Sequence, residues 1–529
     1  MLQAALRLLV AAAVLSAAGC TAGPDEEPAN GVVIGISEPR QLIPTDTVDV
    51  SGVQVLNALF YPLVTIDRAG KPVPAAAASV TPDRTARVWT IRLKPGFTFS
   101  NGEPVTADNY IAAWNFGAYG LNEQRNAFAF ERIDGYVGLQ SRGSGRPAAH
   151  TLRGLKKIND TTFSVTLSAP FAGWASLLDG TAFYPLPASA FASPGVIANG
   201  YDKLIVGNGP FKLAEPWDRG SAIRMDRVAA FRGPVPKIDN IVWKIYRNPV
   251  DGYADLASGE LDVQPEIPPG RLRSAAEDLG DRLQRSPGSA FAFLGFPVYR
   301  PEFAKPDVRR ALSMSINRDE VADRSNGAET PATAFVSPVV PGYRAGACAD
   351  YCSYDPAKAR AAYAAAGGPP AITIAYSRDA GHQAVVDAMC RQITAALGIG
   401  CTGVGEGSLV DLLAKAEERQ SAGLIRMSWT MNYPLMESYL SPIYGTSGSA
   451  NVYGYSNPAF DNLVTQGAEA PTPARAIRKW QQAEDILAQD MPVIPVSFGQ
   501  NVFGHSQRVT NVAIDPAQRI DLYKLEVVG

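Results

Sequence analysis

The chain contains 529 residues, of which 46% are hydrophobic and 19% are charged, and its formal net charge is −3. This composition is ordinary for a globular protein in water, and the length favours roughly two to four domains because a single core does not grow to this size. Lys and Arg are spread along the chain and form no block that could follow a phosphate backbone, so nucleic acid is not expected as a partner.

The N-terminus has the features of an export signal. Arg7 supplies a short basic start, about eleven apolar or small residues follow, and Ser16-Ala17-Ala18-Gly19 precede Cys20. This run is too short to span a membrane. Ala-Gly-Cys resembles the lipobox of bacterial lipoproteins, which predicts a signal peptide at 1–19 and a lipid on Cys20. The alternative is an ordinary cleaved signal whose first cysteine falls here by chance.

Residues 20–31 are predicted to be a flexible tether, because their Pro, Asp, Glu and small residues cannot bury apolar surface. No later stretch contains about 18 consecutive apolar residues, so the sequence predicts no membrane span. We therefore expect an exported protein that a lipid holds at the outer face of the cell membrane, in the cell envelope.

Strands and helices are both expected along the rest of the chain. β-Branched or alternating segments predict strands at 32–36, 88–93, 163–167, 223–225, 241–245 and 372–376. The turn at Lys94-Pro95-Gly96 predicts a hairpin between 88–93 and 97–99. Capping residues and periodicity predict helices at 110–114, 306–316, 356–366, 382–397 and 474–489. This mixture indicates several α/β lobes rather than repeats.

Four cysteines remain when Cys20 is set aside for the lipid. Cys348 and Cys352 are four residues apart, and Cys390 and Cys401 are eleven apart. An oxidising exterior favours pairing within each couple. Free thiols or a zinc site are the alternatives, but zinc would want supporting histidines. Of the three histidines, only His382 is near any cysteine. We predict two disulfides and no metal.

Signatures of catalysis are missing from the sequence. There is no Gly-x-Ser-x-Gly elbow, His-Glu-x-x-His or Walker A loop. Gly403 to Gly407 lacks the spacing of a dinucleotide fingerprint and is interpreted as a flexible surface loop. His382 is expected to begin a helix as a solvated imidazole. We therefore expect no catalytic residue and no cofactor.

Aromatic and polar residues gather between Arg426 and Tyr439. The segment begins as an expected strand, Leu424 to Thr430, and then reaches Pro434, which ends the strand. The end of this strand is therefore open for contact with a ligand.

Several segments together resemble a known family. Leu63 to Pro74 and Trp89 to Gly96 match it, and Phe99-Ser100-Asn101-Gly102-Glu103-Pro104-Val105-Thr106-Ala107-Asp108 is close to its signature. Further matches lie at 207–213, 259–263, 308–312 and 491–496. The family is that of extracytoplasmic solute-binding proteins, family 5, the oligopeptide- and dipeptide-binding lipoproteins of peptide ABC importers. Cys390, Cys401 and the run 354–359 resemble actinobacterial members.

The resemblance implies an α/β fold, a bilobed periplasmic-binding-protein-like clamp of the cluster C type, with mixed sheets and an extra accessory domain. The first lobe would comprise 32–52, 183–285 and 490–529. The accessory domain would comprise 53–182, and the second lobe 286–489.

The resemblance also implies where the ligand lies. The groove floor and walls would be Arg426, Ser428, Trp429, Thr430, Asn432 and Tyr433, with Val50 facing them from the first lobe and Phe498 on the hinge side. Members that bind a free peptide ammonium carry Asp at the position of Asn432. Glu437 or Asp49 could supply the carboxylate instead. Otherwise the ligand lacks a free ammonium, as in a blocked peptide or a non-peptide solute.

The expected function is a monomeric, lipid-anchored receptor that captures peptides or peptide-like solutes and delivers them to the permease of an ABC importer. Two alternatives belong to other classes. One is a surface sensor of peptides that does not take part in transport, and the other is an exported hydrolase, against which the scarcity of histidine argues.

Overall fold

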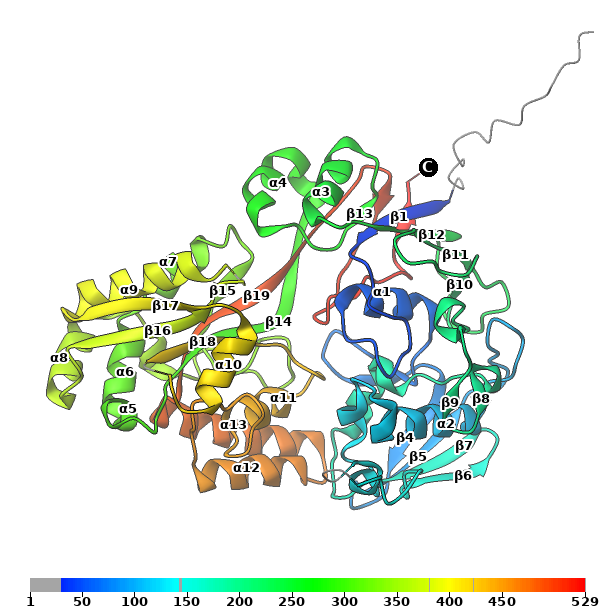
Figure 1. Ribbon diagram of the computed structural model, residues 1–529, viewed down its shortest axis with the longest axis horizontal. Helices are drawn as coiled ribbons and strands as arrows, with labels where there is room; N and C mark the ends of the chain where they lie inside the picture. The colour runs from blue at the N-terminus through cyan, green and yellow to red at the C-terminus, as the bar shows by residue number, and fades with distance from the viewer. Residues whose placement is uncertain (1–29, 142–144, 380, 422, 529) are drawn as a thin grey trace, which may run out of the picture.

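The computed structural model describes residues 30–141, 145–379, 381–421 and 423–528 (Figure 1). The predicted signal peptide, Cys20 and residues 21–29 of the predicted tether lie outside the described residues. The predicted tether is one residue too long, because Gly31 already belongs to strand β1 (Gly31–Ile36), whose residues are all buried. In the four described ranges, no helix is both long and apolar enough to cross a membrane.

Among the described residues, eleven strands form one mixed sheet that extends through both halves of the molecule (Figure 1). The order is β10 (Phe211–Leu213), β11 (Ile223–Arg227), β12 (Asn240–Ile245), β1, β13 (Val263–Gln264), β19 (Val493–His505), β14 (Leu283–Gly295), β18 (Leu424–Trp429), β16 (Ala371–Ser377) and β17 (Gly400–Glu406), and β15 (Glu329–Pro331) pairs with β19.

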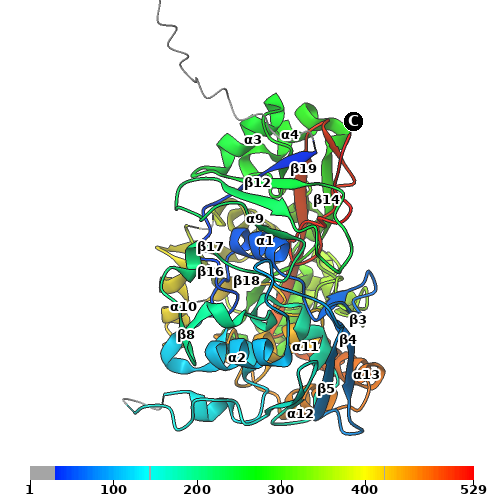
Figure 2. The same ribbon diagram turned by 90° about the vertical axis from the view of Figure 1, so that its right-hand side faces the viewer.

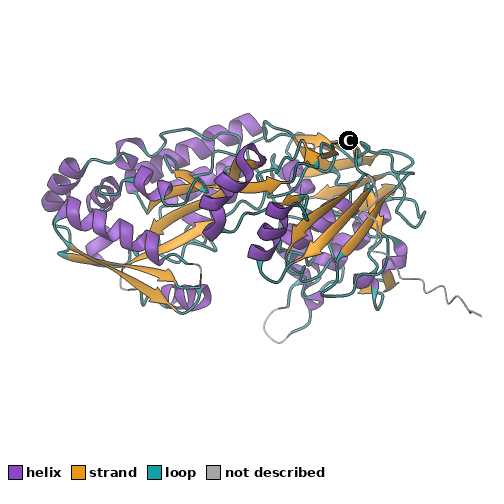
Figure 3. Cartoon of the chain, turned by 90° about the horizontal axis from the view of Figure 1, so that it is seen from above, coloured by secondary structure: helices purple, strands orange, loops and turns teal. Residues whose placement is uncertain are grey.

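Two long strands join the halves. β14 and β19 contain 13 residues each and run antiparallel. Leu283 pairs with Gly504 at one end, where β13 continues the sheet, and Phe291 pairs with Phe498 toward the other, where β18 continues it. The register shifts between Pro287 and Phe291. The molecule is bilobed, as expected, and these strands connect the lobes (Figures 1 and 3).

The first lobe is built around β1. β1 lies parallel to β12 over six residue pairs, and β11 pairs antiparallel with β12, which confirms the predicted strand pair. Helices α3 (Pro249–Ser258) and α4 (Leu272–Leu279) bury Leu256 and Leu279 against Val33 of β1 in a separate small core. Helix α1 (Val50–Leu59) lies between β12 and helix α2 (Ala107–Ala118) of the accessory domain (Figure 2).

The accessory domain has its own antiparallel sheet. Its order is β4 (Ala77–Pro82), β5 (Val88–Leu93), β7 (Thr162–Thr166) and β6 (Leu155–Asn159). Thr106 and Asn109 form a capping box at the start of α2, where the sequence predicts a helix start. Trp114 of α2 is fully buried, and its ring centroid lies 5.6 Å from that of Phe163 and 6.3 Å from that of Trp174.

The predicted hairpin between 88–93 and 97–99 is wrong. Both edges of β5 are occupied, by β4 on one side and by β7 on the other. Residues 97–99 leave the sheet after Gly96, which has a φ of +82°. Phe97 and Phe99 are buried elsewhere, and Phe97 stacks on Tyr61 at 5.8 Å between ring centroids. Burial of these rings decides the path of the chain here.

The second lobe contains the predicted helices, with small shifts at their ends. They are α6 (Pro306–Met314), α8 (Pro356–Ala366), α9 (Gln383–Leu397) and α13 (Pro473–Asp490). The lobe also contains α5 (Pro301–Ala304), α7 (Arg318–Asp323), α10 (Leu409–Glu417), α11 (Glu437–Tyr439) and α12 (Pro458–Ala468). Short strands outside the two larger sheets are β2 (Val64–Ile66), β3 (Pro72–Pro74), β8 (Phe191–Ser193), β9 (Val196–Ile197), β20 (Val509–Thr510) and β21 (Glu526–Val527).

The predicted flexible loop at 403–407 is wrong, because residues 400–406 form β17. This strand pairs in parallel with β16 along its whole length. A Cβ at Gly403 would lie 2.9 Å from Val386, and one at Gly405 would lie 2.7 Å from Arg378. Glycine therefore serves close packing at these two positions rather than flexibility.

Both predicted disulfides are present. Cys390 of α9 is bonded to Cys401 of β17, with 5.0 Å between their Cα atoms, and Cys348 is bonded to Cys352, with 5.8 Å between theirs. The bond between Cys390 and Cys401 ties α9 to the edge strand β17.

The residue boundaries expected for the three domains stay a prediction.

One buried carboxyl makes stability depend on pH. Glu484 of α13 is fully buried, accepts a hydrogen bond from Phe335 N at 3.2 Å and pairs with Arg344 at 3.2 Å. Burial raises the pKa of Glu484 from 4.5 to about 7, although Arg344 opposes the rise. The folded protein therefore holds this proton more tightly than the unfolded chain does.

We expect the free energy of unfolding to fall as pH rises from about 4.5 to about 7, by at most about 1.4 kcal/mol per pH unit from this group. Glu484→Gln should remove this part of the slope in melting curves recorded from pH 5 to 8. Glu469→Gln, which changes an exposed carboxyl outside this cluster of charges, is the control. Equal slopes for Glu484→Gln and the unmodified protein would contradict the assignment.

Candidate functional site

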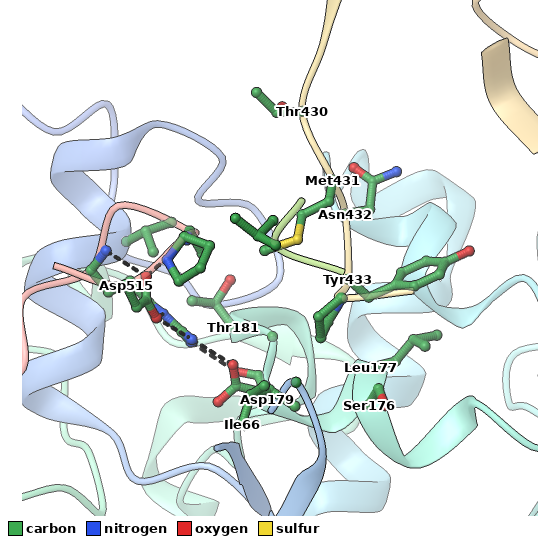
Figure 4. Close-up of a pocket in the computed structure, with 18 of the residues that line it drawn as sticks. Ile66, Ser176, Leu177, Asp179, Thr181, Thr430, Met431, Asn432, Tyr433 and Asp515 are labelled. Atoms are coloured by element: carbon green, nitrogen blue, oxygen red, sulfur yellow. Dashed lines mark hydrogen bonds and ion pairs between the residues drawn. The ribbon is translucent and has the colours of Figure 1, made fainter. Parts of the chain in front are cut away.

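A cavity of about 980 Å³ lies where the two lobes and the accessory domain face one another (Figure 4). Its size is at the upper end of the range for small-molecule sites, which is about 300–1,000 Å³. Its lining includes Thr47, Val48, Ile66, Phe128, Glu131, Arg132, Ser176, Leu177, Asp179, Thr181, Ser286, Pro287, Pro338, Val339, Thr430, Met431, Asn432, Tyr433, Asp515 and Arg519. Because Ser286 and Pro287 belong to β14, the cavity reaches the strands that join the lobes.

The segment after β18 forms one wall of the cavity. Trp429 Nε1 donates to the carbonyl oxygen of Ser438 at 2.8 Å, and Asn432 N donates to Ser438 Oγ at 2.8 Å. These bonds hold the segment back onto α11, so that Thr430, Met431 and Asn432 line the cavity (Figure 4). The strand β18 ends at Trp429, and the residues that follow it line the cavity. The sequence predicts that this strand end is open for contact with a ligand.

The structure brings only some of the predicted site residues to this cavity. Thr430, Asn432 and Tyr433 line it. Phe498 is 2% exposed and packs between Phe291 and Tyr343, with ring centroids 5.8 and 6.0 Å away. The others that lie outside its lining, within the described residues, are Val50, Arg426, Ser428, Trp429 and Glu437.

Arg426 carries a buried charge. It is 4% exposed, it donates from Nη1 to the carbonyl oxygen of Met427, and its Nε has no acceptor among the described residues. Burial lowers the pKa of Arg426, and Glu329 opposes this effect. Burial, and then the charge of Arg426, lower the pKa of His382 to about 4, so His382 is neutral near pH 7.

Glu437 is already engaged within the protein. Its Oε1 accepts from Arg132 of the accessory domain at 2.9 Å, and its Oε2 accepts from the hydroxyl of Tyr433. Arg132 also lies 4.1 Å from the centre of the Phe171 ring. The segment that lines the cavity is therefore fastened to the accessory domain by an ion pair whose carboxylate is buried.

The other carboxylate expected to replace the missing Asp is also engaged. Asp49 caps α1 by accepting from Gly52 N at 2.7 Å, and it accepts from Arg40 N at 3.3 Å. Glu131, by contrast, lines the cavity, and no described residue donates to its side chain. Burial raises the pKa of Glu131, Arg132 opposes the rise, and Glu437 adds to it.

A second group of charges lies on the wall formed by the accessory domain and the C-terminal segment. Arg519 Nη2 is 2.5 Å from Asp179 Oδ2 and 2.7 Å from Asp515 Oδ2. Burial raises the pKa of Asp179, whereas the charge of Arg519 opposes the rise. Burial acts to lower the pKa of Arg519, but the carboxylates of Asp179 and Asp515 raise it overall.

Sequence reasoning missed Glu131, Asp179, Asp515 and Arg519. Asp179 and Arg519 are 340 positions apart, and neither stands in a local pattern that indicates a site.

The molecule has two lobes that share the strands β14 and β19, and its cavity is lined from both lobes. These features define the class of a bilobed ligand-binding protein.

The comparisons with known proteins agree with this class. Residues 71–451 match the family model described as bacterial extracellular solute-binding proteins, family 5 Middle. The chain therefore belongs to the family 5 solute-binding proteins. It is 26% identical over 495 residues to the dipeptide-binding protein DppE of Bacillus subtilis, covering 89% of this chain and 86% of the relative. It is 25% identical over 507 residues to the glutathione-binding protein GsiB of Escherichia coli K12, covering 92% and 93%.

Solved structures share the fold. The unliganded open form of the periplasmic murein tripeptide binding protein MppA superimposes with a TM-score of 0.82 at 20% identity, covering 95% of this chain and 98% of that chain. The complex of Haemophilus influenzae OppA with RPPGFSPFR gives 0.70 at 22% identity, covering 96% and 100%. These likenesses support the mixed α/β bilobed architecture.

The ion pair between Arg132 and Glu437 should couple the accessory domain to the second lobe energetically. Breaking a buried pair from one side leaves a charge without compensation. In a double-mutant cycle with Arg132→Met and Glu437→Gln, followed by urea unfolding, we expect a coupling energy of at least about 1 kcal/mol.

The exposed pair of Arg153 and Asp134, 2.7 Å apart with the Arg153 side chain 77% exposed, is the control. Its coupling should stay below about 0.5 kcal/mol. Equal coupling in the two cycles would show that the contact between Arg132 and Glu437 does not fasten the segment.

Proposed function

We propose that this protein is an extracytoplasmic receptor that captures peptides or peptide-like solutes between its lobes and delivers them to the permease of an ABC importer. The observation that carries this proposal is the cavity of about 980 Å³ whose lining comes from both lobes and from β14. A ligand bound there contacts both lobes, which β14 and β19 connect, so its binding can favour one arrangement of the lobes.

The hinge is proposed at the register shift between Pro287 and Phe291. Strand pairing is continuous from Leu283 to Pro287, is interrupted before Phe291, and shifts register once more between Ala292 and Phe293. An interruption in a two-strand connection concentrates bending, because fewer backbone hydrogen bonds change than in the paired halves. Closing then requires that ligand contacts from both walls outweigh the cost of bending.

The ligand class is proposed from the groups along the cleft. A peptide offers an ammonium, a carboxylate and backbone groups. Arg426 and Ser428 lie on β18 outside the cavity lining, and they would contact only a ligand that extends from the cavity past Thr430 along this strand. A carboxylate near Arg426 would give its buried guanidinium the ionic partner that the described residues do not provide. Trp429, Val50 and Phe498 would then be neighbours of the groove rather than direct contacts.

Asn432 argues for a solute that does not place a free ammonium beside it. Its side chain can accept a hydrogen bond but gives no Coulombic compensation to a cation. Glu437 and Asp49 are engaged, whereas Glu131 lines the cavity and receives no side-chain hydrogen bond within the described ranges. Blocked or modified peptides are therefore proposed beside ordinary ones, and glutathione, named for one relative, is a natural compound to test.

Lipid attachment at Cys20, a monomeric state, delivery to a permease and binding without catalysis are parts of the same proposal. They are supported by the signal sequence and by family membership. A sensor that does not take part in transport would have the same fold, and only a permease partner separates the two roles.

The function is tested by ligand-induced stabilisation. The purified protein is gently unfolded and refolded to remove carried-over ligand, and its melting temperature is measured with di- to pentapeptides, their N-acetylated forms and glutathione. A ligand present at a hundredfold its Kd stabilises the folded state by about 2.7 kcal/mol, which melting curves detect readily. If no compound of the set raises the melting temperature, the peptide-receptor proposal fails.

Asn432→Asp should increase the affinity of the cleft for ligands that carry a free ammonium group. We expect the affinity for peptides with a free N-terminus to rise at least tenfold, about 1.4 kcal/mol, while acetylated peptides gain nothing. Titration calorimetry with matched pairs measures the difference, and Asn432→Ala is the control for loss of the amide. Unchanged affinity for the free peptides would show that the missing carboxylate at position 432 does not limit the binding of a ligand ammonium.

A further inference from the structure

The wall of the cavity opposite residues 430–433 holds more negative than positive charge. Arg519 is the single cation within ion-pair distance of both Asp179 and Asp515 among the described residues. One guanidinium against two carboxylates leaves one negative charge without compensation. Figure 4 shows Asp515 and Asp179 on this wall, across the cavity from Thr430 and Met431.

Asp179 offers an oxygen to the cavity. The residue is 8% exposed and lines the cavity, and its Oδ2 is taken by Arg519. Its Oδ1 accepts no hydrogen bond from any residue in the described ranges. The side chain of Asp179 is 11% exposed, so the carboxylate retains some contact with the cavity. A buried carboxylate oxygen of this kind favours a cation or a hydrogen-bond donor.

Two hydroxyl groups lie on the same wall. Ser176 is 5% exposed, and Ser176 and Thr181 both line the cavity; Thr181 lies near Asp179, and Ser176 lies beside Leu177 (Figure 4). In the described part of the chain neither side chain has a hydrogen-bond partner. A primary ammonium has three donors, and one carboxylate oxygen with two hydroxyl oxygens supplies acceptors of that number.

The remaining cations at the cavity do not neutralise Asp179. Arg132 is paired with Glu437, and Lys524 is paired with Asp521. Arg68 is exposed, and no ion pair joins it to Asp179 in the described residues. The charge on this wall is thus left for something that enters the cavity.

We propose that Asp179, supported by Asp515, Ser176 and Thr181, forms a subsite for a positively charged group of the ligand, a primary ammonium or a guanidinium. This inference rests on the proposed function, since it takes the cavity as the ligand site. The protein then selects solutes with a basic group. A neutral group of the same length gives the charge of Asp179 no compensation, and Asp179 repels an acidic group.

The test uses titration calorimetry with three tripeptides that differ only in the central residue: Ala-Lys-Ala, Ala-norleucine-Ala and Ala-Glu-Ala. We expect Ala-Lys-Ala to bind at least tenfold more tightly than the norleucine peptide, and Ala-Glu-Ala to bind most weakly. Asp179→Asn has the same shape and leaves Arg519 balanced by Asp515, so the protein should still fold. This variant should reduce the preference for lysine to less than threefold.

Asp134→Asn is the matched control, because Asp134 is also a carboxylate paired with an arginine, Arg153, but neither residue lines the cavity. It should leave the preference for lysine unchanged. No preference in the original protein, or the same preference in Asp179→Asn, overturns the subsite while peptide binding itself still stands.

A second measurement separates the subsite from peptide recognition. The melting temperature is recorded at equal concentrations with lysinamide and norleucinamide whose α-amino groups are acetylated, so that only the lysine side chain carries a charge. If the tripeptides do not bind but lysinamide alone stabilises the original protein and not Asp179→Asn, the subsite stands and the peptide receptor falls. If neither the tripeptides nor lysinamide has an effect, both proposals are wrong.

Discussion

The antiparallel pairing of β14 with β19 is the constraint on which the rest of the structure depends. Each strand belongs to both lobes, so the central sheet is continuous, and the lobes share backbone hydrogen bonds rather than only a side-chain interface. The register shift near Pro287 interrupts this pairing beside the cavity. The continuous sheet fixes how the two lobes are aligned, and the register shift in β14 and β19 gives a place where the lobes can move relative to each other.

Buried charge is the second determinant of the cleft. The part of the chain that lines it is held by ion pairs that come from distant segments: Arg132 with Glu437, and Arg519 with Asp179 and Asp515. Such pairs add little net stability, because desolvation offsets the attraction, but they specify which groups meet. In the part of the chain that the structure describes, Arg426, Glu131 and Asp179 lack a full partner for their charge. These are the places where a ligand gains most from complementary charge.

Local patterns in the sequence predicted local structure well. The helices at α8 and α13 begin after capping residues and Pro, and the β11–β12 pair follows from alternation around a turn. Errors arose where two local interpretations competed. Glycines at 403 and 405 indicated flexibility, yet their lack of a side chain is what admits Val386 and Arg378 close to β17. The turn at Gly96 indicated a hairpin, but β5 already had partners on both edges.

By itself, the sequence determined the mixed α/β class, the five helices α2, α6, α8, α9 and α13, both disulfide pairings, the family resemblance and one wall of the cavity, at Thr430, Asn432 and Tyr433. These features depend on spacing within short segments or on ordered runs of matching residues, which a linear chain displays directly. Only the tertiary structure decided that Glu437 is occupied by Arg132 and that Asp179 meets Arg519. The state of a carboxylate depends on its neighbours in space, and these neighbours are hundreds of residues away along the chain.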